Sequence, residues 1–318
     1  MTNYAANLDA VREASERIAP HAHRTPVLTC ATLDALAGRQ LFFKCENFQK
    51  VGAFKFRGAC NAVLRLSDET AAHGVVTHSS GNHAQALALA ATLRNVQAHI
   101  VMPTSAMPVK RRAAEGYGAT VYPCEPTLAA REEMAARVIE QTGAVLIPPY
   151  DHPDIIAGQG TVGLELMDQI PDLDAIIAPV GGGGLLSGVC IAAKALKPAI
   201  RIFAAEPAGA DDAARSMAAG RLIPQTNPNT IADGLLTSLG EHTWPIIRDH
   251  VERVITVPDD KIIEAMRLVW ERMKIIIEPS AAVAVAAVLG NGFQSLDNIS
   301  RVGVVLSGGN VDLNQLPW

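Results

Sequence analysis

The sequence predicts an α/β protein built on parallel sheets, and three observations lead to this fold class. Short runs of β-branched residues alternate with longer Ala- and Leu-rich stretches along most of the 318 residues. Apolar residues make up 49% of the chain but aromatic residues only 4%, which suits tight packing of helices on both faces of a sheet. The turns between the runs are short, as in βαβ units. We therefore expect doubly wound open sheets.

The individual elements follow from composition and period. We predict strands at 41–44, 74–78, 98–102, 120–122, 145–147, 175–179, 201–205 and 302–307. We predict helices at 83–93, 110–117, 129–142, 158–169 and 185–195, and a charged amphipathic helix within 1–20.

The Pro-rich stretch 148–153 has the composition of a linker and divides these elements into two groups. We predict a small domain at 70–150, inserted into a larger domain formed by 1–69 and 151–318. A cleft between two such domains is a natural active site, because ligands bind at the carboxyl ends of parallel strands.

Composition argues against several classes of protein. The net charge of -5, without a basic stripe, disfavours nucleic-acid binding. Apolar runs such as 281–289 are too short to cross a bilayer, and 1–20 lacks the apolar core of a signal peptide. The five cysteines are widely spaced without a C-x-x-C pair, so neither a disulfide framework nor a zinc site is indicated. We expect a cytoplasmic protein that binds neither nucleic acid nor membranes.

Four consecutive glycines, Gly181, Gly182, Gly183 and Gly184, follow an apolar run that ends at Val180. Glycines at a strand-to-helix turn expose backbone N–H groups at the positive end of the helix dipole, which suits a phosphate. The pattern G-x-x-x-x-G-K-[ST] is absent, so a nucleoside triphosphate loop of that kind is not indicated. A tight turn is the other interpretation, but four glycines in this position favour a phosphate site.

Three further motifs contain side chains that can do chemistry. Lys55 lies between Phe54 and Phe56 at the start of a helical stretch, where a desolvated amine can form a Schiff base. Most lysines are instead solvated surface charges. The segment 79–83 (Ser-Ser-Gly-Asn-His) precedes a helix, and by itself it is a polar turn with an N-cap. The segment 307–310 (Ser-Gly-Gly-Asn) follows the last predicted strand, where a glycine-rich turn is also expected.

Together these motifs resemble the fold-type II pyridoxal-phosphate enzymes, most closely the branch with serine racemase, the serine/threonine dehydratases and 3-hydroxyaspartate dehydratase. The resemblance covers nearly the whole chain and includes the segments 44–47, 52–59, 80–83, 157–161, 181–184, 205–207, 231–234, 278–279 and 307–310. It implies two doubly wound open α/β domains, one large and one small, with the active site in the cleft between them.

The resemblance also implies how the cofactor is held. Lys55 should carry pyridoxal 5'-phosphate and take the Cα proton of the substrate. Phe54 should stack near the cofactor ring, Asn82 should hydrogen-bond its phenolic oxygen, and Ser307 should face its pyridine nitrogen. The tetraglycine, Gly181 to Gly184, should hold the phosphate.

On the substrate side, Ser80 matches the family's acid and base on the face opposite Lys55. Arg131 falls where serine racemase-like members have an arginine near the distal group of the substrate. An arginine there could pair with a second carboxylate, which favours 3-hydroxyaspartate; a solvated helix arginine is the alternative. The residues implied to bind the substrate carboxylate are Ser79, Ser80, Gly81, Asn82 and His83.

A divalent cation and a homodimer are implied as well. Glu206, the backbone carbonyl of Ala210 and Asp212 match the family's metal ligands, and such oxygen donors suit Mg²⁺, Mn²⁺ or Ca²⁺. From the residues alone, Asp211 and Asp212 would simply cap the helix that follows. We expect the cation to be structural.

These inferences predict elimination of water from a small 3-hydroxy-amino acid to give a 2-keto acid and ammonia, with 3-hydroxyaspartate and oxaloacetate favoured. Dehydration of serine or threonine and racemisation of serine stay open, because Lys55 and Ser80 would flank Cα on opposite faces. The joint presence of Lys55, Ser80 and Ser307 disfavours a catalytically silent binding module. An NAD-linked dehydrogenase is disfavoured because no G-x-G-x-x-G motif with a downstream acidic partner is in place.

Overall fold

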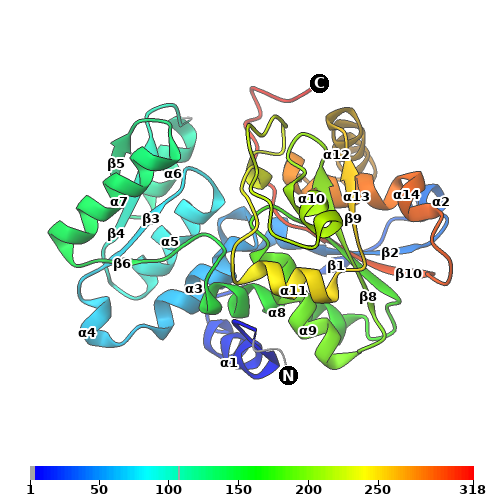
Figure 1. Ribbon diagram of the computed structural model, residues 1–318, viewed down its shortest axis with the longest axis horizontal. Helices are drawn as coiled ribbons and strands as arrows, with labels where there is room; N and C mark the ends of the chain where they lie inside the picture. Colours follow the sequence, from blue (N-terminus) through cyan, green and yellow to red (C-terminus); the bar gives the residue numbers. More distant parts are fainter. Residues whose placement is uncertain (1–3, 107) are drawn as a thin grey trace.

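The computed structural model describes residues 4–106 and 108–318, and in these residues it contains two sheets that lie side by side (Figure 1). The larger sheet has the strand order β1-β2-β10-β7-β8-β9, and the smaller has the order β5-β4-β3-β6. All neighbouring strands are parallel except the antiparallel pair β1 and β2. The strands are β1 (Val27–Leu28), β2 (Gln40–Cys45), β3 (Val75–His78), β4 (Ala98–Pro103), β5 (Thr120–Cys124), β6 (Val145–Leu146), β7 (Ala175–Pro179), β8 (Arg201–Pro207), β9 (Arg253–Val257) and β10 (Arg301–Leu306).

The eight predicted strands are confirmed, with ends that shift by no more than two residues. Two strands were not predicted, and both lie at the edges of the larger sheet: β1 and β9. An edge strand is covered less than a central one, so its sequence is less apolar and gives a weaker signal. In β9 only Val257 is buried, and Arg253 is exposed.

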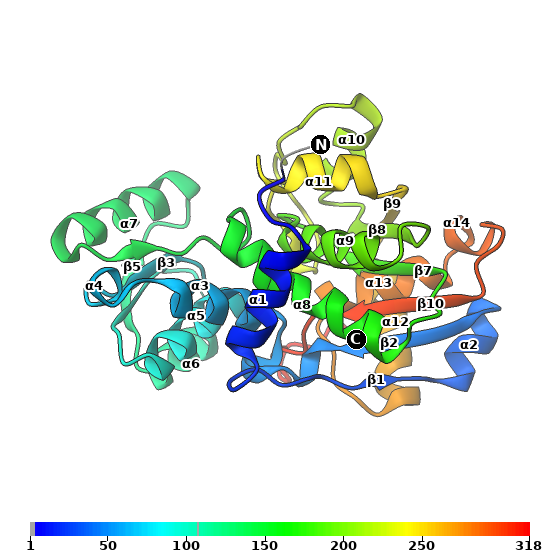
Figure 2. The same ribbon diagram turned by 90° about the horizontal axis from the view of Figure 1, so that it is seen from below.

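Helices pack around both sheets and connect most of the strands (Figure 2). They are α1 (Leu8–Ile18), α2 (Ala31–Ala37), α3 (Lys55–Arg65), α4 (Asp68–Ala71), α5 (Asn82–Leu93), α6 (Pro108–Gly116), α7 (Leu128–Thr142), α8 (Pro153–Gln169), α9 (Gly184–Leu196), α10 (Asp212–Ala219), α11 (Thr243–His250), α12 (Asp259–Met273), α13 (Pro279–Leu289) and α14 (Asn291–Gln294), with the 3₁₀ turns η1 (Glu46–Phe48), η2 (Lys50–Gly52) and η3 (Asp233–Leu235).

The predicted helices are confirmed as α5 to α9, and the amphipathic N-terminal helix appears as α1; residues 1–3 lie outside the described part of the chain. Helix α8 begins five residues earlier than predicted, because His152 caps it and Pro153 suits its first position. The apolar run 281–289 lies in α13, which is buried in the core of the larger sheet. No helix in the described ranges is long and apolar enough to cross a membrane.

Helix α8 joins the two halves of the molecule. In both views it lies between the sheets, next to α3 (Figures 1 and 2). A Cβ on Gly158 of α8 would lie 2.6 Å from Cα of Gly58 in α3. A Cβ on Gly188 of α9 would lie 2.4 Å from the backbone nitrogen of Gly160 in α8. The three helix backbones therefore touch, because no side chain separates them.

The strands of the smaller sheet all lie within the predicted small domain, 70–150. Helix α3 precedes residue 70, yet its Phe56 and Val63 belong to the same apolar cluster as Leu87 of α5. This helix also contacts α8, so it connects both halves of the molecule. The division of the chain into domains stays a prediction.

Replacing Gly158 with alanine should lower the free energy of unfolding by about 1–3 kcal/mol, because the added methyl group forces α3 and α8 apart. Gly116→Ala in α6 is the matched control, because a Cβ there meets no heavy atom within 4 Å. That variant should keep or slightly raise stability. Denaturant unfolding followed by circular dichroism measures both, and equal stability of the two variants would contradict the close helix contact.

Candidate active site

Lys55 is the first residue of α3, and its Nζ donates a 2.6 Å hydrogen bond to the carbonyl of Pro149. The amine lies 5.2 Å from the centre of the Phe54 ring and 5.9 Å from that of Tyr150. Burial lowers the pKa of Lys55 to about 8, against a smaller opposing effect of the Glu278 carboxylate. Roughly a tenth of such an amine is neutral at pH 7, so Lys55 can act as a nucleophile or a base near neutrality.

The four glycines form a strand-to-helix turn beside the same tyrosine. Strand β7 ends at Pro179 and α9 begins at Gly184, with Gly183 in the left-handed conformation at φ 88°. A Cβ on Gly182 would lie 2.3 Å from the Tyr150 ring, so only glycine lets the chain pass so closely. The first N–H groups of a helix have no partner within it. Together with the helix dipole they form a cradle that fits a phosphate.

The side-chain amide of Asn82 is held in one orientation by its neighbours. Asn310 donates from Nδ2 to the Val51 carbonyl at 2.7 Å and to Asn82 Oδ1 at 2.9 Å. Asn82 in turn donates from Nδ2 to Glu278 Oε1 at 2.9 Å and Oε2 at 3.2 Å. The two carboxylate oxygens share one N–H of the amide, so the other N–H stays available as a donor. This orientation fits the predicted hydrogen bond to a phenolic oxygen.

Glu278 and Asn310 were part of the motifs in the sequence, but no role was assigned to them. The carboxylate of Glu278 is buried and also accepts the backbone N–H of Asn310 at 3.1 Å. Burial raises the pKa of Glu278 to about 7; the charge of Asp233 adds to this, and the hydrogen bond from Asn82 opposes it. In the sequence, an acidic residue directly before Pro279, at the start of an apolar helix, is the signal that could have revealed Glu278 as a site residue.

Ser307 lies directly after β10, which is a central strand of the larger sheet. It is buried, and its carbonyl accepts the Phe54 N–H at 3.0 Å. Ala53 and Gly308 form an isolated β-bridge beside this contact. Because β10 pairs with β7 in parallel, the ends of the two strands bring Ser307 and the tetraglycine turn to one edge. Lys55 follows Phe54, which bonds to Ser307, and Asn82 is bonded to Asn310, which follows Ser307. Both therefore lie beside the same edge of the larger sheet.

Comparison with known proteins identifies the family of this chain. Residues 18–308 match the family model described as pyridoxal-phosphate dependent enzyme. The chain belongs to this family. It is 55% identical over 316 residues to the serine racemase of Arabidopsis thaliana, which covers 98% of this chain and 96% of the relative. It is 48% identical over 315 residues to the beta-hydroxyaspartate dehydratase of Paracoccus denitrificans (strain Pd 1222), which covers 99% of both. A solved structure of maize serine racemase matches with a TM-score of 0.97 at 52% identity, over 98% of this chain and 95% of that one.

These likenesses confirm the predicted fold class and the predicted type of enzyme. The chain is a pyridoxal-phosphate-dependent enzyme of the serine racemase and dehydratase branch, in which lyases and racemases are both found. The role of each side chain in this enzyme stays a prediction.

The turn from Ser79 to His83 joins β3 to α5 in the smaller sheet. The N–H of Ser79 donates to the Val101 carbonyl at 3.1 Å, and its hydroxyl accepts the Gly81 N–H at 3.4 Å. Ser80 is half-buried in the same turn. The turn therefore places the hydroxyls of Ser79 and Ser80 at the carboxyl end of a parallel strand, whereas the N–H groups of Ser79 and Gly81 are already bonded within the protein.

His83 differs from the rest of this turn because its ring is neutral. Its Nε2 lies 3.0 Å from the Ile147 carbonyl, so this nitrogen carries the proton and donates. Its Nδ1 is buried and has no hydrogen-bond partner among the residues that the structure describes. Burial, and then the charge of Lys55, lower the pKa of His83 to about 3. The ring can accept a hydrogen bond through Nδ1, but near neutral pH it is no cationic donor to a carboxylate.

Arg131 lies in the first turn of α7, where its Nε donates to the Thr127 carbonyl at 3.3 Å. It forms no ion pair with any residue that the structure describes. Burial, and then the charge of Arg131, lower the pKa of His78, which directly precedes Ser79. The charge of Arg131 also lowers the pKa of Cys124 at the end of β5, against the larger effect of burial. The guanidinium therefore acts on both β3 and β5, and it has donors without a charged partner among the described residues.

The predicted metal ligands lie at the end of β8 and the start of α10. Glu206 accepts the N–H groups of Ala213 and Ala214 at 2.8 and 2.9 Å, and burial raises its pKa to about 8. Asp212 accepts the Leu239 N–H on Oδ2, while its buried Oδ1 has no partner in the described chain; burial raises its pKa to about 6.

Two buried carboxylates with an unpartnered oxygen fit a hard cation. Among the described residues no three His, Cys, Asp or Glu side chains lie close enough together to hold a metal ion, so the predicted site relies on a backbone carbonyl as well as the two carboxylates. The carbonyl of Ala210, a buried residue between them in the sequence, is the predicted one.

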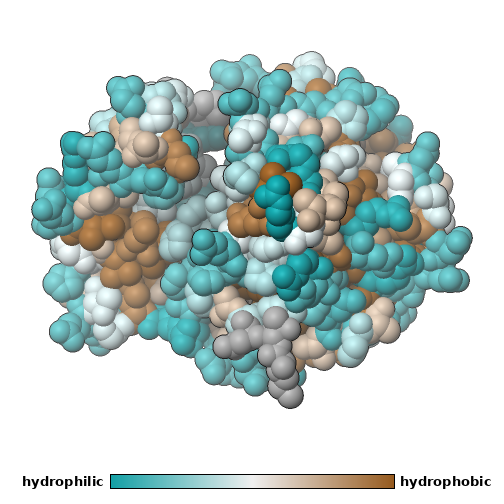
Figure 3. Space-filling view, viewed as in Figure 1, coloured by the Kyte–Doolittle hydropathy of each residue, from teal (hydrophilic) through white to brown (hydrophobic). Residues whose placement is uncertain are grey.

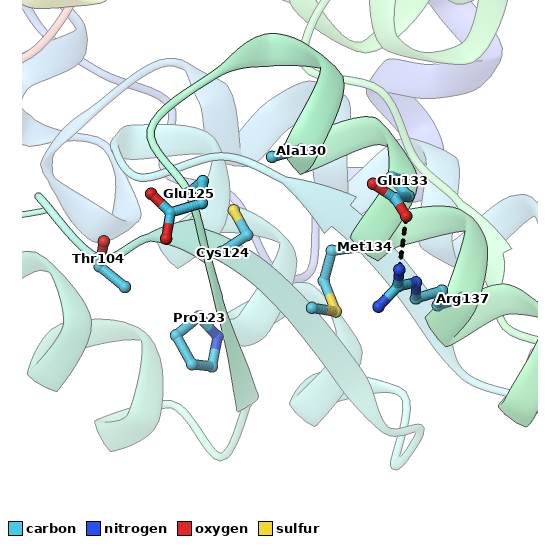
Figure 4. Close-up of a pocket in the computed structure, with 8 residues that line it drawn as sticks. All are labelled: Thr104, Pro123, Cys124, Glu125, Ala130, Glu133, Met134 and Arg137. Carbon is cyan, nitrogen blue, oxygen red and sulfur yellow. Dashed lines mark hydrogen bonds and ion pairs between the residues drawn. The ribbon is translucent and has the colours of Figure 1, made fainter.

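A pocket of about 340 Å³ lies elsewhere, between the end of β5 and α7 (Figure 4). Cys124, Met134 and Arg137 line it, and Arg137 pairs with Glu133 at 2.5 Å. None of the predicted site residues lines this pocket. Lys55, the tetraglycine turn, Asn82 and Ser307 lie together at another place, as the contacts of Lys55, Tyr150, Asn310 and Glu278 show. The surface is hollowed between the two halves of the molecule (Figure 3). The pocket is therefore not the candidate active site.

Uptake of pyridoxal 5'-phosphate by the cofactor-free protein should rise with pH and level off above a midpoint near 8. The reason is that only the neutral amine attacks an aldehyde, so uptake slows about tenfold per pH unit below the midpoint. Stopped-flow absorbance measures the rate. Lys55→Ala should show no covalent uptake, colour or activity, whereas Lys50→Ala is the control and should keep the midpoint. A midpoint near the ordinary lysine value of 10.5 would contradict the burial of Lys55.

Proposed function

We propose that this enzyme removes water from 3-hydroxyaspartate and releases oxaloacetate and ammonia. The Cα proton and the β-hydroxyl leave as water, and the enamine that results becomes an imine. Addition of water to this imine then gives the keto acid and ammonia. The likeness to a beta-hydroxyaspartate dehydratase supports the proposal.

The observation that carries the choice of substrate is the guanidinium of Arg131. It has no ion-pair partner among the residues described, and it lies close enough to His78 to lower the pKa of that ring. The neighbouring turn offers donors for one carboxylate, so a second carboxylate is the group that would complete the pairing of Arg131. A bidentate arginine–carboxylate pair gives both energy and orientation. A dicarboxylic substrate uses this arrangement and serine does not.

The side chains around Lys55 suit this elimination. Pyridoxal phosphate, when bound, withdraws electrons from the substrate Cα and makes its proton acidic. Lys55 takes this proton, because burial keeps part of its amine neutral near pH 7. The tetraglycine N–H groups would hold the phosphate, and the second N–H of Asn82 would donate to the phenolic oxygen. Ser307 would face the pyridine nitrogen with a hydroxyl and no carboxylate, which would leave that nitrogen unprotonated and favour rapid loss of the β-hydroxyl.

Racemisation of serine, with dehydration of serine or threonine, is the second candidate, and the likeness to serine racemases supports it. Ser80 is the residue that would distinguish the two reactions. Elimination needs a proton removed from one face of Cα, whereas racemisation also needs a donor on the other face. The ratio of racemisation to elimination in Ser80→Ala therefore measures this role, and an equal loss of both would give Ser80 a broader one.

We also propose that Glu206, Asp212 and the carbonyl of Ala210 hold a structural Mg²⁺, Mn²⁺ or Ca²⁺. The unpartnered Oδ1 of Asp212 supports this site.

A homodimer and a cytoplasmic location remain the expectations from the family and from cysteine usage. The five cysteines, all unpaired in the structure, agree with a reducing compartment.

Arg131→Ala should lower kcat/KM for 3-hydroxyaspartate by about 10- to 100-fold and leave that for serine nearly unchanged. The measurement is keto-acid release from serine, threonine and both diastereomers of 3-hydroxyaspartate. Arg137→Ala on the same helix is the matched control, because Arg137 pairs with Glu133 on the exposed face. If serine and 3-hydroxyaspartate fall equally, or neither changes, Arg131 is not the selector and a general serine/threonine dehydratase becomes the better interpretation.

Chelation of divalent cations should lower the melting temperature and the activity together, and Mg²⁺ or Ca²⁺ should restore both. A ligand that binds only the folded state stabilises it by about 2.7 kcal/mol at a hundredfold excess over its Kd. Asp212→Asn should melt like the chelated enzyme and no longer respond to chelator. Asp211→Asn is the control, because Asp211 is paired with Arg215. A chelator response that survives in Asp212→Asn would remove this residue from the site.

A further inference from the structure

Four charged side chains are buried together behind the start of α3, and we call them the charge quartet: Lys44, Glu46, Arg57 and Glu165. Lys44 and Glu46 are fully buried, Arg57 is 1% exposed and the side chain of Glu165 is 13% exposed. They come from β2, η1, α3 and α8. Two cations and two carboxylates balance, so the quartet is neutral.

Arg57 is the centre of the quartet, because its guanidinium lies between the two carboxylates. It donates to Glu46 from Nε at 2.7 Å and from Nη2 at 2.9 Å. It donates to Glu165 from Nη1 at 2.7 Å and from Nη2 at 2.9 Å. Nη1 also reaches Thr161 Oγ1 at 3.1 Å, and Nη2 reaches the His23 carbonyl at 3.2 Å. A planar guanidinium bound on every side has one orientation.

Lys44 completes the quartet from β2. Its Nζ donates to Glu165 Oε2 at 2.6 Å, to Gln169 Oε1 at 2.9 Å and to the Thr25 carbonyl at 2.8 Å. Burial alone would raise the pKa of Glu165, but the hydrogen bonds and charges of Arg57 and Lys44 outweigh it and lower this pKa. Glu165 therefore stays ionised, and the pairing persists at neutral pH.

In the first turn of α3 the N–H groups of Phe56 and Arg57 bond locally to Ala53 and Phe54, and contacts from other elements add to these bonds. Phe54 precedes the helix and provides no side-chain cap. The N–H of Gly58 is bound by Gln159 Oε1 of α8 at 3.1 Å. A buried ionic cluster rarely stabilises a fold more than apolar side chains of equal volume would, but it can enforce a single geometry. In this enzyme the cluster ties Arg57, two residues after Lys55, to η1 and to α8.

We propose that Arg57 is a positioning residue that holds the first turn of α3 between η1 and α8 and so fixes Lys55 relative to the substrate. Arg57 touches neither substrate nor cofactor and acts through the helix backbone. The proposal rests on the role proposed for Lys55. A reacting group displaced by about 1 Å loses roughly 100-fold in rate, so a loose first turn would be costly for catalysis.

The test needs variants that loosen this turn without leaving a lone buried charge. Arg57→Met alone would leave the Glu46 carboxylate buried without a cation, which is strongly destabilising. The double variant Arg57→Met with Glu46→Gln leaves Lys44 and Glu165 as a neutral pair. Arg57→Lys is the second variant, because an ammonium keeps the charge but cannot bind both carboxylates bidentately.

Arg65→Met is the matched control. Arg65 is on the same helix and pairs with Asp154 of α8, but its side chain is 54% exposed. Loss of an exposed ion pair changes little. Denaturant unfolding of all variants shows which of them fold.

Two measurements decide between positioning and a merely structural role. The first is steady-state kinetics, in which the double variant should lose about 100-fold in kcat with little change in KM, since the substrate is bound by other elements. The second is the pH dependence of Lys55 acetylation in the cofactor-free protein, followed by mass spectrometry. Its midpoint should move from about 8 toward 10.5 as water reaches the amine. The groups that face Lys55, namely Glu278, His83 and Tyr150, are unchanged in these variants.

A folded double variant with wild-type kcat and a wild-type acetylation midpoint overturns the proposal, even if its stability is lower. If the double variant does not fold, Arg57→Lys decides by the same two measurements. A failure of the proposed function would be seen in a different variant. An active Lys55→Ala enzyme would refute the role of Lys55, whatever the kinetics of the Arg57 variants.

Discussion

The backbone contact of α8 with both α3 and α9 is the constraint on which the active site depends. Gly158 of α8 lets α3 approach closely, and Gly188 of α9 lets α8 approach closely. A Cβ on either glycine would collide with backbone atoms of the neighbouring helix. Helix α3 begins with Lys55, and α9 begins in the tetraglycine turn. Helix α8, which contacts both, therefore sets where the Lys55 amine lies relative to the tetraglycine turn. Tyr150, next to both Lys55 and Gly182, shows how near they are.

Burial is the common cause of the electrostatics around Lys55. It lowers the pKa of the amine to about 8, raises that of Glu278 to about 7 and lowers that of His83 to about 3. Each change favours the uncharged form, as expected where water is displaced. The site thereby has an amine available as a base and an imidazole that accepts a hydrogen bond. Groups with such shifts gather at functional sites more often than elsewhere.

The fold is common to racemases and dehydratases, so the choice of reaction and substrate belongs to a few side chains on that fold. Ser80 and Arg131 are the two proposed to bear on this choice, and both lie in the half of the molecule that contains the smaller sheet. Lys55, Ser307 and the tetraglycine lie at the larger sheet or at α3. The groups that would hold the cofactor and those that would select the substrate are therefore placed on different elements.

The sequence by itself determined the strands, helices and turns whose signals are local. The tetraglycine turn and the helix that begins with Lys55 are of this kind, because conformation and dipole depend on neighbours along the chain. Only the tertiary structure decided the edge strand β9, the orientation of Asn82 by Glu278 and Asn310, and the pairing of Arg57 with Glu165. These depend on contacts between residues far apart in sequence. Burial and hydrogen bonding at such contacts are set by the packing of elements, which no local pattern encodes.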